Sequence, residues 1–123
     1  MNELVNAWVL GYRKAWESND PIDIRGLFTE GAIYRGTPSQ EPGWVGHEQI
    51  VAGWLANQDP PGSTSFDWHI VAVDGSIAVI QALTTYPAGP KRGTYDNLWI
   101  VRLAPDGRAS DYTDWFVARE PIS

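Results

Sequence analysis

The last third of the chain contains two alternating stretches on either side of a turn signal. Residues 93–118 read GTYDNLWIVRLAPDGRASDYTDWFVA, and apolar and polar side chains alternate on both sides of the APDG at 104–107. Period-two alternation rich in aromatic and β-branched residues is typical of strands, and Pro-Asp-Gly is typical of a turn. The stretch therefore predicts a long β-hairpin, which restricts the chain to folds that contain an antiparallel sheet.

A four-residue loop closed by Leu103 and Arg108 would fix how the two strands pair. The predicted pairs are Trp99 with Tyr112, Asn97 with Asp114, and Tyr95 with Phe116. All six residues then share one face, because side chains two apart on a strand point the same way. That face is aromatic except for one amide and one carboxylate, Asp114. An acid on an aromatic wall is the feature on which we base a functional hypothesis.

The rest of the chain alternates between helical and strand patterns. Residues 2–18 carry apolar side chains at three- and four-residue spacing, which predicts a helix. A short second helix after Asp20-Pro21 would turn Ile24, Leu27 and Phe28 inward, followed by a strand at 32–35 and a third helix at 46–57. Strands are predicted at 66–73 and 77–86, and the segment around the PPG at 60–62 is predicted to be a loop.

This order predicts one α+β domain spanning residues 1–123. Its strongly curved antiparallel sheet would wrap around the long N-terminal helix as a cone-like barrel, with two further helices. The sheet and that helix would then enclose a space able to hold a small ligand.

Composition excludes several classes of function. A net charge of −6 argues against nucleic acid and anionic membrane surfaces as partners. The absence of cysteine excludes disulfides and thiolate chemistry, and two histidines are few for a metal site, so we expect no metal. No apolar run approaches the length of a membrane span and no signal-peptide pattern is present, so the cytoplasm is the expected compartment.

The layout and several motifs resemble the nuclear transport factor 2-like superfamily, and within it the SnoaL-like (polyketide cyclase-type) and ketosteroid isomerase-like proteins. The motifs are Tyr12, LFTEGA at 27–32, GHEQI at 46–50, DGR at 106–108 and YTDWF at 112–116. The resemblance implies a small-molecule pocket that works without a cofactor. It leaves the activity open, because the superfamily includes isomerases, cyclases, epoxide hydrolases, dehydratases and non-enzymes.

Residue by residue, the resemblance is incomplete. Tyr12 lies where ketosteroid isomerases keep an oxyanion-binding tyrosine, but their two catalytic aspartates fall on Gly36 and Trp99. Asp114 resembles an aspartate of limonene epoxide hydrolase-like members, whose Arg-x-Asp pair is replaced here by Gln81 and Leu83. The same alignment turns some side chains toward the pocket, namely His69, Val71, Val79, Gln81, Leu83 and Trp54.

These observations assign candidate roles. Asp114 would move a proton because burial among aromatic rings raises the pKa of a carboxyl group, His69 would assist or orient it, and Tyr12 would stabilise an oxyanion. The predicted substrate-binding residues are Trp16, Trp54, Gln81, Asn97, Trp99, Tyr112 and Phe116. Each role has a structural alternative. Asp114 could instead be held by Asn97, Arg35 or Arg102, and His69 and Tyr12 could be ordinary core residues.

The predicted function is therefore a pocket for a small hydrophobic, ring-containing molecule. If the protein is an enzyme, it would catalyse isomerisation, cyclisation or hydration next to a carbonyl without a cofactor. One alternative is binding without turnover. The other is a structural or partner-binding domain, expected if Trp16, Trp54 and Trp99 fill the cavity. An apolar outer sheet face predicts a homodimer, and its expected members are Trp68, Ile70, Leu98, Ile100 and Trp115.

Overall fold

A computed structural model describes residues 2–58, 65–87 and 91–119. Its elements in chain order are α1 (Asn2–Ser18), α2 (Pro21–Arg25), β1 (Phe28–Arg35), β2 (Trp44–Val45), α3 (Gly46–Ala56), β3 (Ser65–Asp74), β4 (Ile77–Tyr86), β5 (Gly93–Leu103) and β6 (Ala109–Ala118). This is the predicted α+β class. The loop predicted around residues 60–62 lies outside the described residues.

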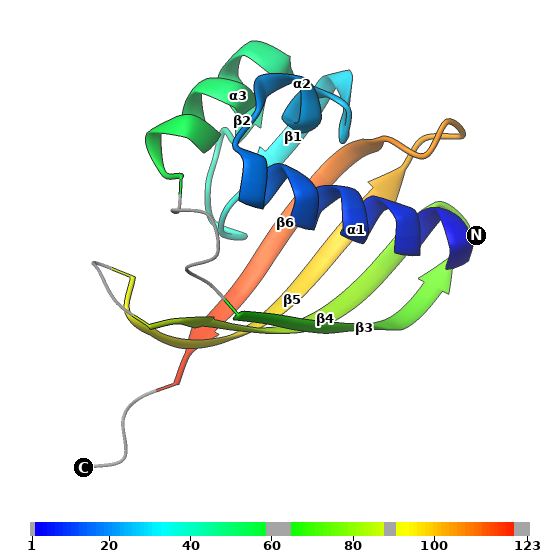
Figure 1. Cartoon of the computed structure of the whole chain (residues 1–123). Coiled ribbons are helices and arrows are strands. Elements are labelled where there is room, and N and C mark those ends of the chain that lie inside the picture. The colour runs from blue at the N-terminus through cyan, green and yellow to red at the C-terminus, as the bar shows by residue number, and fades with distance from the viewer. Residues whose placement is uncertain (1, 59–64, 88–90, 120–123) are drawn as a thin grey trace.

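The strands form one curved sheet in the order β2-β1-β6-β5-β4-β3, and α1 crosses its concave face (Figure 1). The predicted wrapping of a sheet around the first helix is confirmed. The sheet is open, with β2 and β3 at its two edges, so it does not close into a barrel. β1 pairs in parallel with β6, while the other neighbouring strands are antiparallel.

The core lies between α1 and the inner face of the sheet. One stripe of α1 is buried at the predicted helical spacing: Val5, Trp8, Val9, Tyr12 and Ala15. From β4 and β5 it meets an alternating set of buried residues: Ala78, Ile80, Ala82, Trp99, Val101 and Leu103. Because every second residue of these strands is buried, the sheet has distinct inner and outer faces.

The boundary between α2 and β1 differs from the prediction. Asp20 caps α2 through its carboxylate, which accepts a hydrogen bond from the Ile22 amide at 2.9 Å, but the helix ends at Arg25. The Leu27 carbonyl accepts hydrogen bonds from the Ala109 amide at 2.7 Å and the Trp8 indole at 2.9 Å. Leu27 therefore belongs to the sheet side of the boundary, and β1 begins at Phe28 rather than at residue 32. Tertiary pairing overrides the local helical pattern here.

The pairing predicted for the last hairpin is wrong by two residues. Trp99 lies opposite Asp114, Asn97 opposite Phe116, and Val101 opposite Tyr112. One residue of the shift arises in the loop, where the Ala104 amide bonds to the Arg108 carbonyl. The other arises from a β-bulge, because Arg102 pairs with Asp111 whereas Leu103 pairs with Ala109. Two single-residue shifts restore the alternation, so the predicted grouping of residues on one face survives.

The orientation predicted for β3 and β4 is also wrong. His69 and Gln81 pair with each other across the strands and are exposed on the outer face, away from the pocket. Trp68 and Ile70, expected on the outer face, pack against the core instead. Both strands carry apolar residues at odd and even positions, so the sequence pattern does not determine which face is buried.

Candidate functional site

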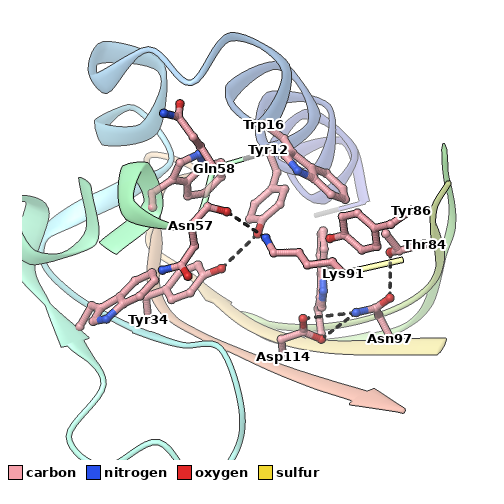
Figure 2. Close-up of a pocket in the computed structure, with 13 residues that line it drawn as sticks. Tyr12, Trp16, Tyr34, Asn57, Gln58, Thr84, Tyr86, Lys91, Asn97 and Asp114 are labelled. Atoms are coloured by element: carbon pink, nitrogen blue, oxygen red, sulfur yellow. Dashed lines mark hydrogen bonds between the residues drawn. The ribbon is translucent and has the colours of Figure 1, made fainter. Parts of the chain in front are cut away.

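Two adjoining hollows open on the inner face of the sheet, beside α1 and the end of α3, and Figure 2 shows the residues that line the inner one. The inner hollow has a volume of about 150 Å³ and the outer one about 270 Å³. Both are lined by Thr84, Tyr86, Lys91, Asn97 and Asp114. The inner hollow adds Tyr12, Trp16, Tyr34, Trp44, Trp54, Asn57, Gln58 and Trp99, and the outer one adds Tyr95 and Phe116. The tryptophans thus form a wall and leave space between them.

Asp114 lies at the junction of the two hollows and is held by a chain of side-chain hydrogen bonds. The Asn97 amide nitrogen donates to the two Asp114 carboxylate oxygens at 3.2 and 3.3 Å. Thr84 donates from its hydroxyl to the Asn97 amide oxygen at 2.9 Å. Because both ends of the amide are occupied, Asn97 is oriented with its N–H toward the carboxylate. β4, β5 and β6 each supply one member of this chain.

The environment of Asp114 favours its protonated form. Burial raises the pKa of Asp114 to about 6, while hydrogen bonding from Asn97 and the nearby Trp99 indole acts in the opposite direction. No arginine or lysine forms an ion pair with Asp114 among the residues that the structure describes. Arg35, one of the predicted alternatives, pairs with Asp111 at 3.1 Å, and Arg102 bonds to Ser76 at 3.3 Å. With a pKa of about 6, Asp114 is half protonated near pH 6 and mostly ionised at neutral pH. A general acid or base is most useful when its pKa lies this close to the working pH.

Three tyrosine hydroxyls gather beside this carboxylate. The Tyr12 and Tyr34 hydroxyls are 3.2 Å apart, and the Tyr112 hydroxyl donates to that of Tyr12 at 3.5 Å. Burial raises the pKa of Tyr34 to about 12 and that of Tyr12 well above its ordinary value. These hydroxyls thus remain protonated at neutral pH, where they can donate hydrogen bonds to a ligand oxygen.

Most of the predicted wall residues lie at the site. Trp16, Trp54, Trp99 and Asn97 line the inner hollow, and Phe116 lines the outer one. Tyr112 is fully buried and lines neither hollow, but its ring packs against those of Tyr34 and Trp99, with centroids 4.6 and 5.5 Å apart.

Sequence reasoning missed several residues at the site, among them Tyr34 and Thr84. Tyr34 shares a strand face with the buried Ala32, two residues away, and its ring stacks on Trp44 with centroids 4.9 Å apart. That spacing was the available signal for Tyr34. Thr84 was missed because the faces of β4 were exchanged in the prediction.

His69 and Gln81 are not part of this site. Both lie on the outer face of the sheet, so the structure does not bring His69 together with Asp114. The proposed Asp114–His69 dyad is therefore wrong, and so is the place of Gln81 as a polar anchor. The polar anchors that the structure places by Asp114 are Asn97 and Thr84.

Polar groups surround the entrance. The Lys91 ammonium donates to the Asn57 carbonyl at 2.9 Å and lies 5.7 Å from the centre of the Tyr86 ring. Figure 2 shows the Lys91 side chain reaching from the β5 side toward the end of α3. The entrance is therefore polar while the interior is aromatic, as in many small-molecule sites.

Within 2–58, 65–87 and 91–119, no three His, Cys, Asp or Glu side chains are grouped so that they could hold a metal ion. The described helices include none that is long and apolar enough to cross a membrane.

Solved structures identify the class of fold. An NTF-2-like protein of unknown function from Burkholderia xenovorans LB400 superposes with a TM-score of 0.74 at 13% identity, over 99% of this chain and 89% of that one. An LEH-like epoxide hydrolase from M. tuberculosis gives 0.66 at 17% identity, over 90% and 80%. A ketosteroid isomerase-like protein from Erwinia carotovora atroseptica SCRI1043 gives 0.65 at 15% identity, over 95% and 96%. The molecule has the NTF2-like fold.

The family follows from the sequence. Residues 9–112 match the model of the SnoaL-like domain, and the chain belongs to that family. No curated protein matches it at a significant level of similarity. Asp114 lies just beyond the matched residues, so its assignment rests on the geometry of the site.

Proposed function

We propose that the protein is an acid–base enzyme that moves a proton next to the carbonyl group of a small, ring-containing molecule. The observation that carries this proposal is the Asp114 carboxyl group, which lies in an aromatic pocket without an ion-pair partner among the described residues. Its pKa of about 6 lets it exist as carboxylate and as acid near neutral pH. The names of the solved neighbours, an epoxide hydrolase and a ketosteroid isomerase-like protein, are consistent with chemistry in such a pocket.

In this mechanism the Asp114 carboxylate takes a proton from the carbon beside the carbonyl. Asn97 holds the carboxylate in place, and the Tyr12 and Tyr34 hydroxyls are protonated donors for negative charge that develops on an oxygen. The protonated Asp114 then returns the proton at the same or another carbon, which gives exchange or isomerisation. The carbonyl itself makes the C–H bond acidic, so this chemistry requires no cofactor.

The dimensions of the pocket favour a small substrate. The inner hollow of about 150 Å³ is roughly the size of an apolar protein cavity that binds benzene. One ring would fill it, and the outer hollow beside Phe116 would take a substituent or a second ring.

The test is proton NMR in D₂O with a panel of cyclic ketones, aryl ketones, polyketide-like aromatics and epoxides. We expect loss of a signal next to a carbonyl for at least one ketone, and we expect Asp114→Asn to lower that rate by about 10²–10⁴-fold. Asp111→Asn is the matched control, because that carboxylate lies on the same strand but pairs with Arg35. Binding without exchange, unchanged in Asp114→Asn, would show that the protein only binds its ligand.

Binding without turnover is the second candidate, and one observation favours it. Asn97 donates to both oxygens of Asp114, which is also what a purely structural carboxylate would accept. A partner-binding domain with a filled cavity has less support, because the tryptophans leave two hollows open.

We also propose that the outer sheet face pairs with a second copy of the chain. Its apolar residues include Leu98, Ile100, Trp115 and Val117, which are 37%, 38%, 49% and 67% exposed. Apolar patches of this kind on a single chain mark association sites. Sedimentation analysis should show a dimer that Trp115→Glu converts to a monomer, and a wild-type monomer would contradict the proposal.

A further inference from the structure

A glycine inside α3 packs directly against a residue of the pocket wall. Gly53 lies within the helical span Gly46–Ala56, where glycine is a poorer helix former than alanine. A Cβ atom placed on Gly53 would lie 2.3 to 2.6 Å from three carbon atoms of the Trp44 indole, far inside van der Waals contact. The lack of a side chain at this position is therefore what allows the indole to pack on the helix backbone.

The backbone is fixed on both sides of this contact. The Asn57 side-chain amide donates to the Gly53 carbonyl at 2.9 Å. Next to Trp44, Gly43 is buried, and a Cβ atom on it would lie 2.5 Å from the Tyr34 carbonyl oxygen, so β2 enters its pairing with β1 at close range. Because both backbones are held in this way, a methyl group added to Gly53 would have to be accommodated by the Trp44 side chain.

The Trp44 indole belongs to a stack of rings at the edge of the hollow. The rings of Trp44 and Tyr34 are nearly parallel, at 11°, with centroids 4.9 Å apart. Tyr34 in turn stacks on the fully buried Tyr112, with centroids 4.6 Å apart. A close-packed stack resists displacement, whereas the hollow that Trp44 and Tyr34 both line is open space. We therefore expect an indole displaced from α3 to move into the inner hollow and to reduce its volume of about 150 Å³.

We infer that Gly53 is a positioning residue that keeps the inner hollow large enough for a six-membered ring. It acts through Trp44, so the Gly53–Trp44 contact determines the size of the ring that the pocket accepts. The inference rests on the proposed function, because it concerns the ring-binding part of the same pocket, and it narrows the substrate class to ketones with a single six-membered ring. In Gly53→Ala the hollow would still take a smaller ring but would exclude a six-membered aromatic one.

The experiment compares cyclopentanone and acetophenone, two ketones whose rings differ in size. NMR titration gives their affinities for the wild-type protein and for Gly53→Ala. We expect the substitution to weaken acetophenone binding by about tenfold or more and cyclopentanone binding by less than about twofold, because overpacking affects the larger ligand more. Equal weakening of both ketones, or no weakening of acetophenone, overturns the inference. A wild-type protein that leaves either ketone unbound up to its solubility limit overturns it as well.

Gly11→Ala is the matched control. It adds the same methyl group inside α1, where the nearest atom to the new Cβ would be the flexible end of the Leu27 side chain at 3.1 Å. We expect it to change neither affinity by more than about twofold. A loss of acetophenone binding equal to that in Gly53→Ala would show that the effect is not specific to the Trp44 contact, and it would overturn the inference.

The Trp44→Val variant shows whether Gly53 acts through the indole. It removes the ring that a Cβ atom on Gly53 would meet and keeps a β-branched residue in β2. In this background, Gly53→Ala should change acetophenone affinity by less than about twofold, because the two substitutions are coupled only through the indole. A tenfold loss that persists without the indole would show a general effect on α3 and overturn the inference.

Two further measurements cover the case in which Gly53→Ala folds poorly. Gly53→Ala should lower Tm by about 5 °C or more when Trp44 is present and should raise it in Trp44→Val, because only the helix preference for alanine then remains. Trp44→Val alone enlarges the hollow and should improve the binding of 2-acetylnaphthalene relative to acetophenone by about tenfold. A Tm change of the same sign in both backgrounds, or an unchanged ratio of the two affinities, overturns the inference.

The same data separate this inference from the proposed function. Size selection that depends on Gly53 and Trp44, without any proton exchange, would support the inference and contradict acid–base catalysis. Exchange that requires Asp114 but falls equally for both ketones in Gly53→Ala would support catalysis and overturn the role of Gly53.

Discussion

The last hairpin holds two aspartates in opposite electrostatic environments. Asp96 faces outward from β5 and accepts two hydrogen bonds from Arg119 at 2.7 and 2.8 Å, which hold its pKa below the ordinary value. Asp114 faces inward from β6, where burial raises its pKa to about 6 and its hydrogen-bond partner is a neutral amide. One carboxylate is stabilised by its surroundings, and the other is kept in surroundings that oppose its charge.

This difference distinguishes a structural carboxylate from a functional one. A protein that needed only a satisfied side chain on the inner wall would have no use for a charge there, since burying it costs free energy. On the outer face, arginine side chains form ion pairs with both Asp96 and Asp111. Asp114 has no such partner among the described residues, and we attribute its presence on the inner wall to chemistry in the pocket.

The largest effect should appear in stability. A pKa raised from 3.8 to about 6 means that ionised Asp114 opposes folding by about 3 kcal/mol at pH 7.5. Asp114→Asn removes the charge and should raise the free energy of unfolding by up to that amount. Because the folded state binds the proton more tightly, the gain should fall as pH drops below 6 and vanish below 3.8. Urea denaturation at several pH values measures it.

Asp96→Asn is the matched variant on the outer face. Its pKa is lowered in the folded state, so its loss should destabilise the protein at neutral pH, the opposite sign from Asp114→Asn. Destabilisation by both substitutions would remove the contrast and assign Asp114 a structural role.

The pH dependence of exchange should follow Asp114 alone. If the carboxylate is the base, kcat/KM for ketone exchange should be half-maximal near pH 6 and fall about tenfold per pH unit below it. Between pH 8 and pH 4 the loss should reach about 10²-fold. NMR time courses recorded at several pH values across this range measure the exchange rate. Asp96→Asn should keep the same midpoint, and a profile flat from pH 8 to pH 5 would rule out Asp114 as the base.

Removing the bond that orients Asn97 should have a smaller effect. Thr84→Val keeps the shape of the side chain but deletes the hydroxyl that donates to the Asn97 amide oxygen. The freed amide can rotate, so we expect about tenfold lower exchange and a loss of about 1–3 kcal/mol in stability. Thr85→Val on the adjacent, opposite-facing position is the control. Equal effects of the two substitutions would show that the Thr84–Asn97 bond is not specific to the site.

The smallest effect should come from the outer face. His69→Ala and Gln81→Ala should each change exchange by less than about twofold, because both side chains point away from Asp114. The same exchange assay measures both. A large loss of activity in a variant that keeps its oligomeric state would reinstate His69 as a participant.

The sequence determined the hairpin and the inner-face grouping of Asn97, Trp99 and Asp114 well, because period-two alternation on β5 and β6 is strong. It failed on β3 and β4, where both faces carry apolar residues and the pattern favours neither orientation. The spacing of Tyr34 from Ala32 indicated its side of the strand, but the roles of Tyr34 and Thr84 could not be predicted. Their roles depend on partners that lie at least thirteen positions away in the chain, Asn97 for Thr84 and Tyr12 for Tyr34.

The β-bulge at the start of β6 has a consequence for how such proteins can change over evolution. The longer loop and the bulge each displace β6 by one residue, and together they return Asp114 to the inner face. A single insertion or deletion between Leu103 and Asp111 would reverse that parity and move the acid to the other side of the sheet. Only insertions or deletions of an even number of residues in this segment would therefore keep Asp114 on the inner face. Insertions or deletions of an odd number would remove the acid from the pocket.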